Sequence, residues 1–231
     1  MPAAISTEKA HKIREAQILR ELHIRRCLKD GHYWLTAGTK TFDDQDKTCP
    51  FKPFPDREYI PHVLDVLENE STVFLEKSRT MMASWLVSGW CAHKGFTSPF
   101  TTVFQSQDED RAVHDVENVK TLWTQSEPEL QARWPLAKPM DKQPYNFLEM
   151  ANGSWFIGIP GDPNKVRSEH PSCYVADEAA FMVDGEDAYG NAQGTRAPHV
   201  ICLSSAAPGW FYDMTKDAKL IDWPKYARVL A

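Results

Sequence analysis

Short runs of apolar and β-branched residues alternate along the chain with longer stretches in which apolar residues recur at helical spacing. The strand-like runs are residues 71–76, 101–105, 173–176 and 200–204, and runs of this length are typical of buried strands. Helical spacing predicts helices over residues 83–94, ended by Gly95, and over residues 108–125. Strands that alternate with helices predict an α/β fold with a mainly parallel sheet covered by helices on both faces.

Residues 146–159 carry a separate signal. Asn152-Gly153 stands between two apolar stretches, and this dipeptide favours the tight turn of a β-hairpin. We therefore expect a hairpin within residues 146–159.

A helix is predicted to precede the alternating region. Residues 6–30 lack Pro and Gly. Five apolar residues recur there, mainly at steps of three or four: Ile13, Ala16, Leu19, Leu22 and Leu28. This spacing predicts an amphipathic helix. The first thirty residues hold seven Lys and Arg against four Asp and Glu, a local basic excess that is also typical of an ordinary solvated helix face.

Residues 31–56 predict an irregular arm, because they are rich in Pro, Thr, Lys and Asp. The arm carries five aromatic residues that we expect to act as anchors: Tyr33, Trp34, Phe42, Phe51 and Phe54. A compact domain is expected to begin near Glu58. The expected organisation is therefore an N-terminal helix and arm over residues 1–57 and one α/β domain over residues 58–231.

Composition and charge restrict the class of protein. The 231 residues are 42% hydrophobic and 25% charged, an ordinary globular mixture. The net charge of −6 excludes a purely electrostatic coat on nucleic acid. The charge is uneven, since residues 108–129 hold seven acidic residues against two basic ones and residues 177–187 hold five acidic residues and no basic one.

Cysteine usage and hydropathy indicate a protein of the reducing cytoplasm. The five cysteines are odd in number, widely spaced and never form a Cys-x-x-Cys pair, so neither a disulfide framework nor a zinc knuckle is predicted. The N-terminus lacks the continuous apolar segment of a signal peptide, and no stretch approaches about 18 uninterrupted apolar residues. We expect no membrane association.

The first candidate site is the loop Lys77–Ser84, which lies between the first predicted strand and a helix. Backbone N–H groups at the start of a helix can bind phosphate. Against the phosphate-loop pattern G-x-x-x-x-G-K-[ST], Lys77 and Met82 replace the glycines, Ala83 replaces the lysine, and only Ser84 fits. Lys77 and Arg79 nevertheless supply the cationic charge that the loop loses at Ala83, and Ser84 offers a hydroxyl to Mg²⁺. The alternative is an ordinary strand-to-helix turn with solvated cations.

The second candidate site is the pair Asp177 and Glu178, which directly follows the buried run 173–176. This is the layout of a Walker B element, in which one carboxylate holds Mg²⁺ and the next orients and deprotonates the attacking water. The alternative is that the two acids begin a helix, whose dipole favours them.

The third candidate site follows the run 200–204, which ends in Ser204 and Ser205. These hydroxyl groups can hydrogen-bond to a γ-phosphate or to the preceding carboxylates, or they can form a plain Ser-rich turn. Ligands of open α/β sheets bind beyond the carboxyl ends of the strands, so the three sites are expected to belong together. Strand 101–105 falls between the strand of the phosphate loop and the acidic strand, as in nucleotide hydrolases of the RecA-type branch, whose extra strand accompanies a catalytic Glu.

With these residues together, the chain resembles the N-terminal ATPase part of a large terminase subunit, the motor that packages DNA into tailed-phage and related capsids. The resemblance runs from about Cys27 to the end. The arm over residues 31–54 resembles the aromatic segment before the ATPase core of that family. Lys77 and Arg79 match its deviant phosphate loop, and Asp177–Phe181 matches its Asp-Glu-Ala-Ala-Phe box.

The resemblance implies a P-loop NTPase fold of the RecA type, with the additional strand that accompanies a catalytic Glu, and ATP and Mg²⁺ as cofactors. The nucleotide loop would consist of Lys77, Ser78, Arg79, Thr80, Met81, Met82, Ala83 and Ser84. Within it, Lys77 would pair with the β- and γ-phosphates. Ser84 and Asp177 would hold the metal.

The catalytic and coupling roles are also implied by the resemblance. Glu178 would position and activate water, while Arg79 or Arg167 would stabilise charge on the transferred phosphoryl group. Arg167 stands where the family often has an Arg ahead of the acidic strand. Ser204 and Ser205 begin a segment that resembles the family's coupling motif, and they would pass the hydrolysis state to the rest of the motor.

The chain departs from the family at two points. The family usually keeps a Gly where Met82 stands, and a bulky residue is poorly suited to a positive φ and to close approach by phosphate. The family also carries a C-terminal nuclease domain, which we do not expect in a chain that ends 23 residues after Pro208.

The expected function is therefore the ATPase of a DNA-packaging motor. Its expected partners are double-stranded DNA, the portal protein, the small terminase subunit and further copies of the chain in a ring. Two alternatives are a helicase-like DNA translocase of the same fold and a non-catalytic terminase remnant that acts only in assembly.

Overall fold

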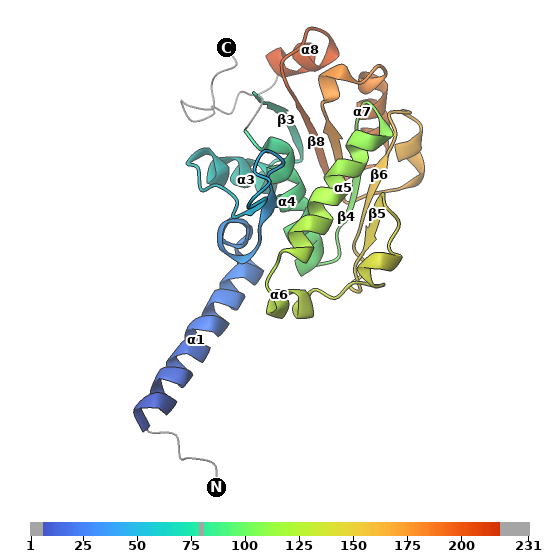
Figure 1. Ribbon diagram of the computed structural model, residues 1–231. Coiled ribbons are helices and arrows are strands. Elements are labelled where there is room, and N and C mark those ends of the chain that lie inside the picture. The colour runs from blue at the N-terminus through green and yellow to red at the C-terminus, as the bar shows by residue number, and fades with distance from the viewer. Residues whose placement is uncertain (1–6, 79–80, 218–231) are drawn as a thin grey trace.

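A six-stranded sheet forms the centre of the molecule (Figure 1). The computed structural model describes residues 7–78 and 81–217. The strands of the sheet are β3 (Thr72–Glu76), β4 (Thr101–Gln105), β5 (Phe147–Glu149), β6 (Trp155–Ile159), β7 (Cys173–Asp177) and β8 (His199–Ser204). Their order is β3-β8-β7-β4-β6-β5, with all neighbours parallel except the edge strand β5. The predicted α/β fold with a mainly parallel sheet is confirmed.

The strand order places β8 between β3 and β7. In the register, Glu76 of β3 pairs with Ser204 of β8, and Asp177 of β7 pairs with Leu203. The strand between the loop strand and the acidic strand of the sheet is thus β8. The expectation that strand 101–105 lies there is wrong, because β4 stands on the far side of β7. Three strand ends meet at one edge as a result.

Helices cover both faces of the sheet because successive strand residues point to opposite sides. One face packs against α3 (Tyr59–Asn69), α4 (Ala83–Thr97) and α5 (Glu109–Thr124), and the other against α7 (Gly185–Gly194) and α8 (Trp210–Asp217). In β7, for example, Val175 belongs to the first core, whereas Tyr174 and Ala176 belong to the second. Strand β7 is therefore buried on both sides, which explains its continuous apolar run.

The predicted strands agree with the observed ones to within one residue at each end. The helix predicted over residues 83–94 is longer than expected, because α4 continues through Gly95 to Thr97. A Cβ at residue 95 would lie 2.4 Å from Cζ of Phe156. Gly95 therefore does not end the helix but leaves space for a ring from β6. The prediction that Gly95 is the stop signal is wrong.

The predicted hairpin is confirmed by the antiparallel pair β5 and β6. Gly153 in its turn has a φ of +89°, a backbone conformation that glycine adopts at little cost. The short helix α6 (Pro128–Arg133) and the 3₁₀ turn Met140–Lys142 precede this hairpin in the chain.

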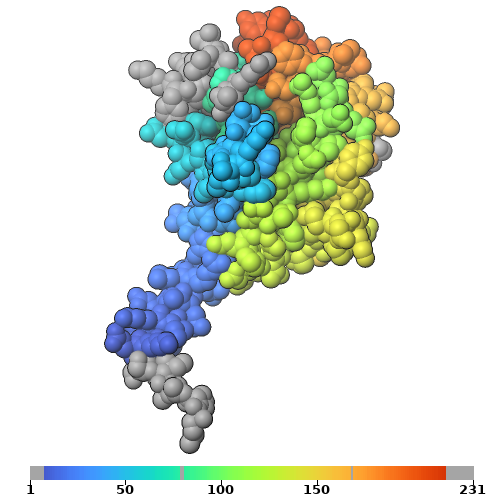
Figure 2. All heavy atoms as spheres, in the orientation of Figure 1, coloured from blue at the N-terminus to red at the C-terminus, as the bar shows by residue number. Residues whose placement is uncertain are grey.

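Helix α1 (Thr7–Lys29) projects from the body of the molecule (Figures 1 and 2). Only its C-terminal part contributes buried residues, Ile24 and Cys27, to the core, whereas Ile13, Leu19 and Leu22 are exposed. The helix itself is confirmed. The apolar residues of its first turns are exposed because the body covers only one side of the last turns.

The arm after α1 begins with the turns Gly31–Tyr33 (α2) and Trp34–Gly38, followed by a small hairpin of β1 (Thr41–Phe42) and β2 (Phe51–Lys52). Trp34 is fully buried and packs edge-on against Trp134 and Phe96, and Phe54 is also buried. Phe42 and Phe51 instead contact each other on the exposed hairpin. Trp34 and Phe54 are therefore anchors, while the prediction for Phe42 and Phe51 is wrong.

The length and hydropathy of the helices decide whether any of them could cross a membrane. None of the helices within residues 7–78 and 81–217 combines the length and apolar character needed to cross a membrane.

The close packing of β6 on α5 generates a stability prediction. A Cβ added at Gly158 would lie 2.7 Å from the carbonyl oxygen of Ala112. We expect Gly158→Ala to lower the free energy of unfolding by about 1–3 kcal/mol, because strand or helix must shift. Urea denaturation measures this. Gly190→Ala is the control, since its Cβ would meet nothing within 4 Å and alanine favours the helix by about 1 kcal/mol. Equal stabilities of the two variants would contradict the prediction.

Candidate functional site

The three predicted sites meet at the carboxyl edge of the sheet. Lys77 directly follows β3, Asp177 is the last residue of β7 with Glu178 after it, and Ser204 ends β8. A main-chain hydrogen bond from Lys77 N to the Ser204 carbonyl (2.9 Å) extends the pairing of β3 and β8 past the end of β3. Parallel pairing therefore brings residues more than a hundred positions apart into one cluster.

The Lys77 side chain binds the two acids. Its Nζ donates to Oε1 of Glu178 at 2.7 Å and lies 3.8 Å from Oδ1 of Asp177. Lys77 is 8% exposed, so this ion pair lies largely out of water. The alternative of a solvated loop cation is thus excluded for Lys77.

Ser84 lies in the first turn of α4 and donates its hydroxyl to Oδ2 of Asp177 at 2.8 Å. The other carboxylate oxygen, Oδ1, accepts the N–H of Glu178 at 2.9 Å. A hydroxyl and a carboxylate side by side are oxygen ligands of the kind that Mg²⁺ prefers, so the residues present fit this metal. Burial raises the pKa of Asp177, while the charge of Lys77 and the hydrogen bond from Ser84 oppose the rise.

Glu178 connects Lys77 to the end of β8. Its Oε2 accepts hydrogen bonds from the Ser205 N–H at 3.3 Å and from the Ser204 hydroxyl at 3.4 Å. Ser204 Oγ in turn accepts the N–H of Ala180 at 3.2 Å. Burial raises the pKa of Glu178, but the hydrogen bond and charge of Lys77 outweigh it, and the pKa lies below its usual value. Both predicted coupling serines therefore touch the predicted catalytic glutamate.

Two residues of the site have left-handed backbone. Met82, immediately before α4, has φ and ψ of 53° and 28°, and Glu178 has 52° and 42°. Such values are uncommon for residues with a side chain, and they cluster at functional sites. Met82 thus adopts the positive φ for which glycine is better suited. Tyr59 of α3 supports the same loop, because its hydroxyl donates to the Met81 carbonyl at 2.8 Å.

The remaining predicted site residues do not all lie in the cluster. Ala83 is buried in the core at the start of α4. Arg79 and Thr80 lie outside the described residues, so their predicted roles stay predictions. Arg167 donates from Nε and Nη2 to Oδ1 of Asn191 on α7, at 3.0 and 2.6 Å. This contact is thus with a neutral side chain of α7 and not with the cluster.

Sequence reasoning missed one hydroxyl group of the cluster. Ser106, which is buried directly after β4, donates to the Asp177 carbonyl at 2.9 Å. Its position after a strand is the same signal that identified Ser204, and it could have been found in that way.

A buried carboxyl group behind the site was also missed. Asp115 of α5 is 3% exposed, its Oδ1 lies 3.5 Å from the Ser88 hydroxyl, and its Oδ2 has no hydrogen-bond partner among the described residues. Burial and then the charge of Asp177 raise its pKa well above the usual value. An acid within the apolar stripe of the predicted helix 108–125 was the available signal.

The raised pKa of Asp115 predicts a pH-dependent stability. Above pH ~4 the unfolded chain ionises at this residue while the folded protein keeps the proton, so the free energy of unfolding falls with rising pH up to the folded-state pKa. The slope is at most about 1.4 kcal/mol per pH unit. We expect Asp115→Asn to match the wild type near pH 4 and to be more stable at pH 7 in thermal unfolding. Asp110→Asn, at an exposed position of α5, is the control. A loss of stability at pH 7 in Asp115→Asn would contradict this account.

Comparison with known proteins gives similarity to solved structures only. No family model matches the sequence, and no curated protein is significantly similar to it. Among solved structures, the chain is similar to the large terminase ATPase domain of Thermus phage P74-26, with 17% identity, a TM-score of 0.45, and coverage of 76% of this chain and 74% of that domain. It is also similar to the large terminase of a thermophilic bacteriophage, with 10% identity, a TM-score of 0.45, and coverage of 66% of this chain and 39% of that protein.

Proposed function

We propose that the chain binds and hydrolyses ATP with Mg²⁺ at the carboxyl edge of the sheet. The observation that supports this most directly is the convergence of a lysine, two carboxylates and two serines at three strand ends with the Ser84 hydroxyl of α4. These are the groups that phosphoryl transfer to water requires, since such catalysis consists mainly of positioning and charge stabilisation.

The roles follow from the contacts. Lys77 Nζ is the cation of the described part of the loop, and phosphate oxygens would compete with Glu178 for it. Ser84 and Asp177, whose oxygens are already adjacent, would hold Mg²⁺, which neutralises charge on the phosphates. Phosphate binding at Lys77 would release Oε1 of Glu178, the atom that then can accept a proton from water.

Ser204 and Ser205 would report the state of Glu178 to the rest of the molecule. Both bind Oε2 of Glu178, and Ser204 is also paired through its carbonyl with Lys77 N. A movement of Glu178 therefore changes hydrogen bonds at the end of β8. An arginine for the transferred phosphoryl group would come from Arg79 or Arg167.

The biological setting is proposed from the sequence resemblance to large terminase subunits. Residues 58–231 would carry the ATPase of a motor that moves double-stranded DNA into a procapsid in the host cytoplasm. The portal protein, the small terminase subunit and further copies of the chain would be its partners. Stimulation of hydrolysis by duplex DNA together with portal protein would favour packaging over a helicase-like translocase.

Glu178→Gln tests the catalytic step. The amide keeps the shape of the side chain but cannot accept a proton from water, so we expect the steady ATPase rate to fall roughly 100-fold or more. ATP binding should remain. Glu117→Gln, on the exposed side of α5, is the control and should keep the wild-type rate. An unchanged rate in Glu178→Gln would show that this role is wrong.

Lys77→Ala tests the displaced lysine. Loss of a charged hydrogen bond of about 1.5–3 kcal/mol should weaken ATP binding roughly 10- to 100-fold, measured by fluorescence titration, with circular dichroism to verify folding. Lys142→Ala, at an exposed turn, should bind normally. If the folded wild type binds no ATP at all, the non-catalytic alternative is favoured and the proposed activity is wrong.

A further inference from the structure

The outward side of α1 carries an exposed stripe of apolar and basic residues. Residues separated by three or four positions share one side of a helix. The stripe consists of His11, Arg14, Ile18, Leu22, Arg25 and Lys29. Ile18 and Leu22 are 54% and 56% exposed, and Leu19 beside them is 61% exposed. We call this the arm stripe.

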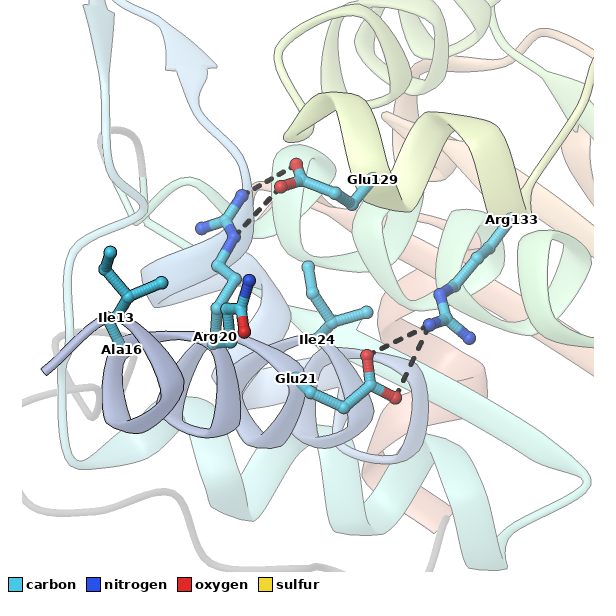
Figure 3. A pocket seen from close by; sticks show the side chains of 8 residues that line it. Ile13, Ala16, Arg20, Glu21, Ile24, Glu129 and Arg133 are labelled. Carbon is cyan, nitrogen blue, oxygen red and sulfur yellow. Dashed lines mark hydrogen bonds and ion pairs between the residues drawn. The ribbon is translucent and has the colours of Figure 1, made fainter. Parts of the chain in front are cut away.

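The opposite side of α1 is fixed to the body. Figure 3 shows it facing α6 across a hollow lined by Ile13, Ala16 and Ile24 among others. Two ion pairs cross to α6, from Arg20 to Glu129 at 2.7 Å and from Arg133 to Glu21 at 3.2 Å (Figure 3). These contacts set the rotation of the helix. The arm stripe therefore faces away from the body rather than toward it.

A second exposed surface has the complementary character. It lies between the Glu178 turn and the first turn of α7, and it consists of Phe181, Val183, Asp184, Glu186 and Asp187. Val183 is 93% exposed and Phe181 is 45% exposed. Within the described parts of the chain, no Lys, Arg or His forms an ion pair with these three acids. We call this surface the acidic corner.

We infer that the arm stripe of one copy of the chain docks on the acidic corner of a second copy. Ile18, Leu19 and Leu22 would cover Phe181 and Val183, while Arg14 and Lys29 would face the three acids. Arg25 is ion-paired with Glu21 at 2.9 Å and would exchange that partner for the acids. Charge complementarity of this kind selects the partner and its orientation. Contiguous apolar residues rimmed by charges are typical of interaction surfaces.

The two surfaces lie at opposite ends of one molecule and cannot meet within it, so their complementary charges favour a second copy as the occupant. Helix α1 leaves the body at one end, while α7 and the turn before it lie at the other (Figure 1). A contact between two different surfaces repeats from copy to copy, so it generates a ring if it closes and a filament if it does not. Each copy would use both surfaces.

The contact is expected to be weak and sensitive to salt. Helix α1 has 23 residues and is therefore about 35 Å long, and only a few apolar side chains would be covered. Stable interfaces bury about 800 Å² on each partner, so a smaller contact should form only at micromolar or higher concentrations. Exposed ion pairs are screened by added salt.

Sedimentation velocity with the full chain over a range of concentrations tests the inference. We expect the wild type to associate at about 50 mM salt and to dissociate progressively as salt is added. Reversal of the arm stripe (Arg14→Glu, Arg25→Glu, Lys29→Glu) and reversal of the acidic corner (Asp184→Lys, Glu186→Lys, Asp187→Lys) should each leave monomers. Circular dichroism verifies that the variants are folded.

A mixture of the two reversed variants is the decisive test, because each arm stripe then meets an acidic corner or its reversed form with the opposite charge. We expect the mixture to associate. The matched control reverses three exposed lysines elsewhere, Lys40→Glu, Lys47→Glu and Lys142→Glu, and should associate like the wild type.

Several outcomes would overturn the inference. They are a monomeric wild type at low salt, a control that dissociates as readily as the arm variant, and a mixture that stays monomeric. Association of the corner variant alone would show that the arm pairs with something other than the acidic corner. None of these measurements depends on ATP hydrolysis, so the inference and the proposed activity can fail separately.

Discussion

A buried ion pair at the carboxyl edge of the sheet is the constraint on which the candidate site depends. Two adjacent carboxylates, Asp177 and Glu178, lie there largely out of water, and the Lys77 ammonium compensates their charge. Leaving a buried charge without its partner costs about 3–5 kcal/mol, so the three groups must stay together in the folded protein. Such a rigid frame explains how Met82 and Glu178 keep left-handed backbone that is unfavourable by itself.

Most strands of the sheet were predictable because each is a short apolar run buried on both sides. Failures occurred where a distant residue decides the local outcome. Gly95 would ordinarily end a helix, but here α4 continues through it. The ring of Phe156 from β6 occupies the space that a side chain at residue 95 would need. In α1, spacing correctly predicted a helix, yet periodicity does not reveal which side the body covers, and Leu19 and Leu22 are exposed.

Most residues of the site were predictable from the sequence, but the order of the strands that carry them was not. Lys77, Asp177 and Ser204 converge because parallel strands end at the same edge. The place of β8 between β3 and β7 could not be derived, since strand order depends on long-range pairing and leaves no local pattern. Asp115 was hidden for another reason, because a single acid within a helical stripe is usually assigned to the solvated side.

The position of β8 has a consequence for how the chain folds. Strand β8 follows the other five strands of the sheet in sequence but pairs with both β3 and β7. Until residues 199–204 have left the ribosome, β3 lacks its only sheet neighbour among the described strands and β7 keeps an open edge. Unpaired edges of this kind favour aggregation and slow folding. A nascent chain would therefore need protection until β8 inserts, and the site would form in that same late step.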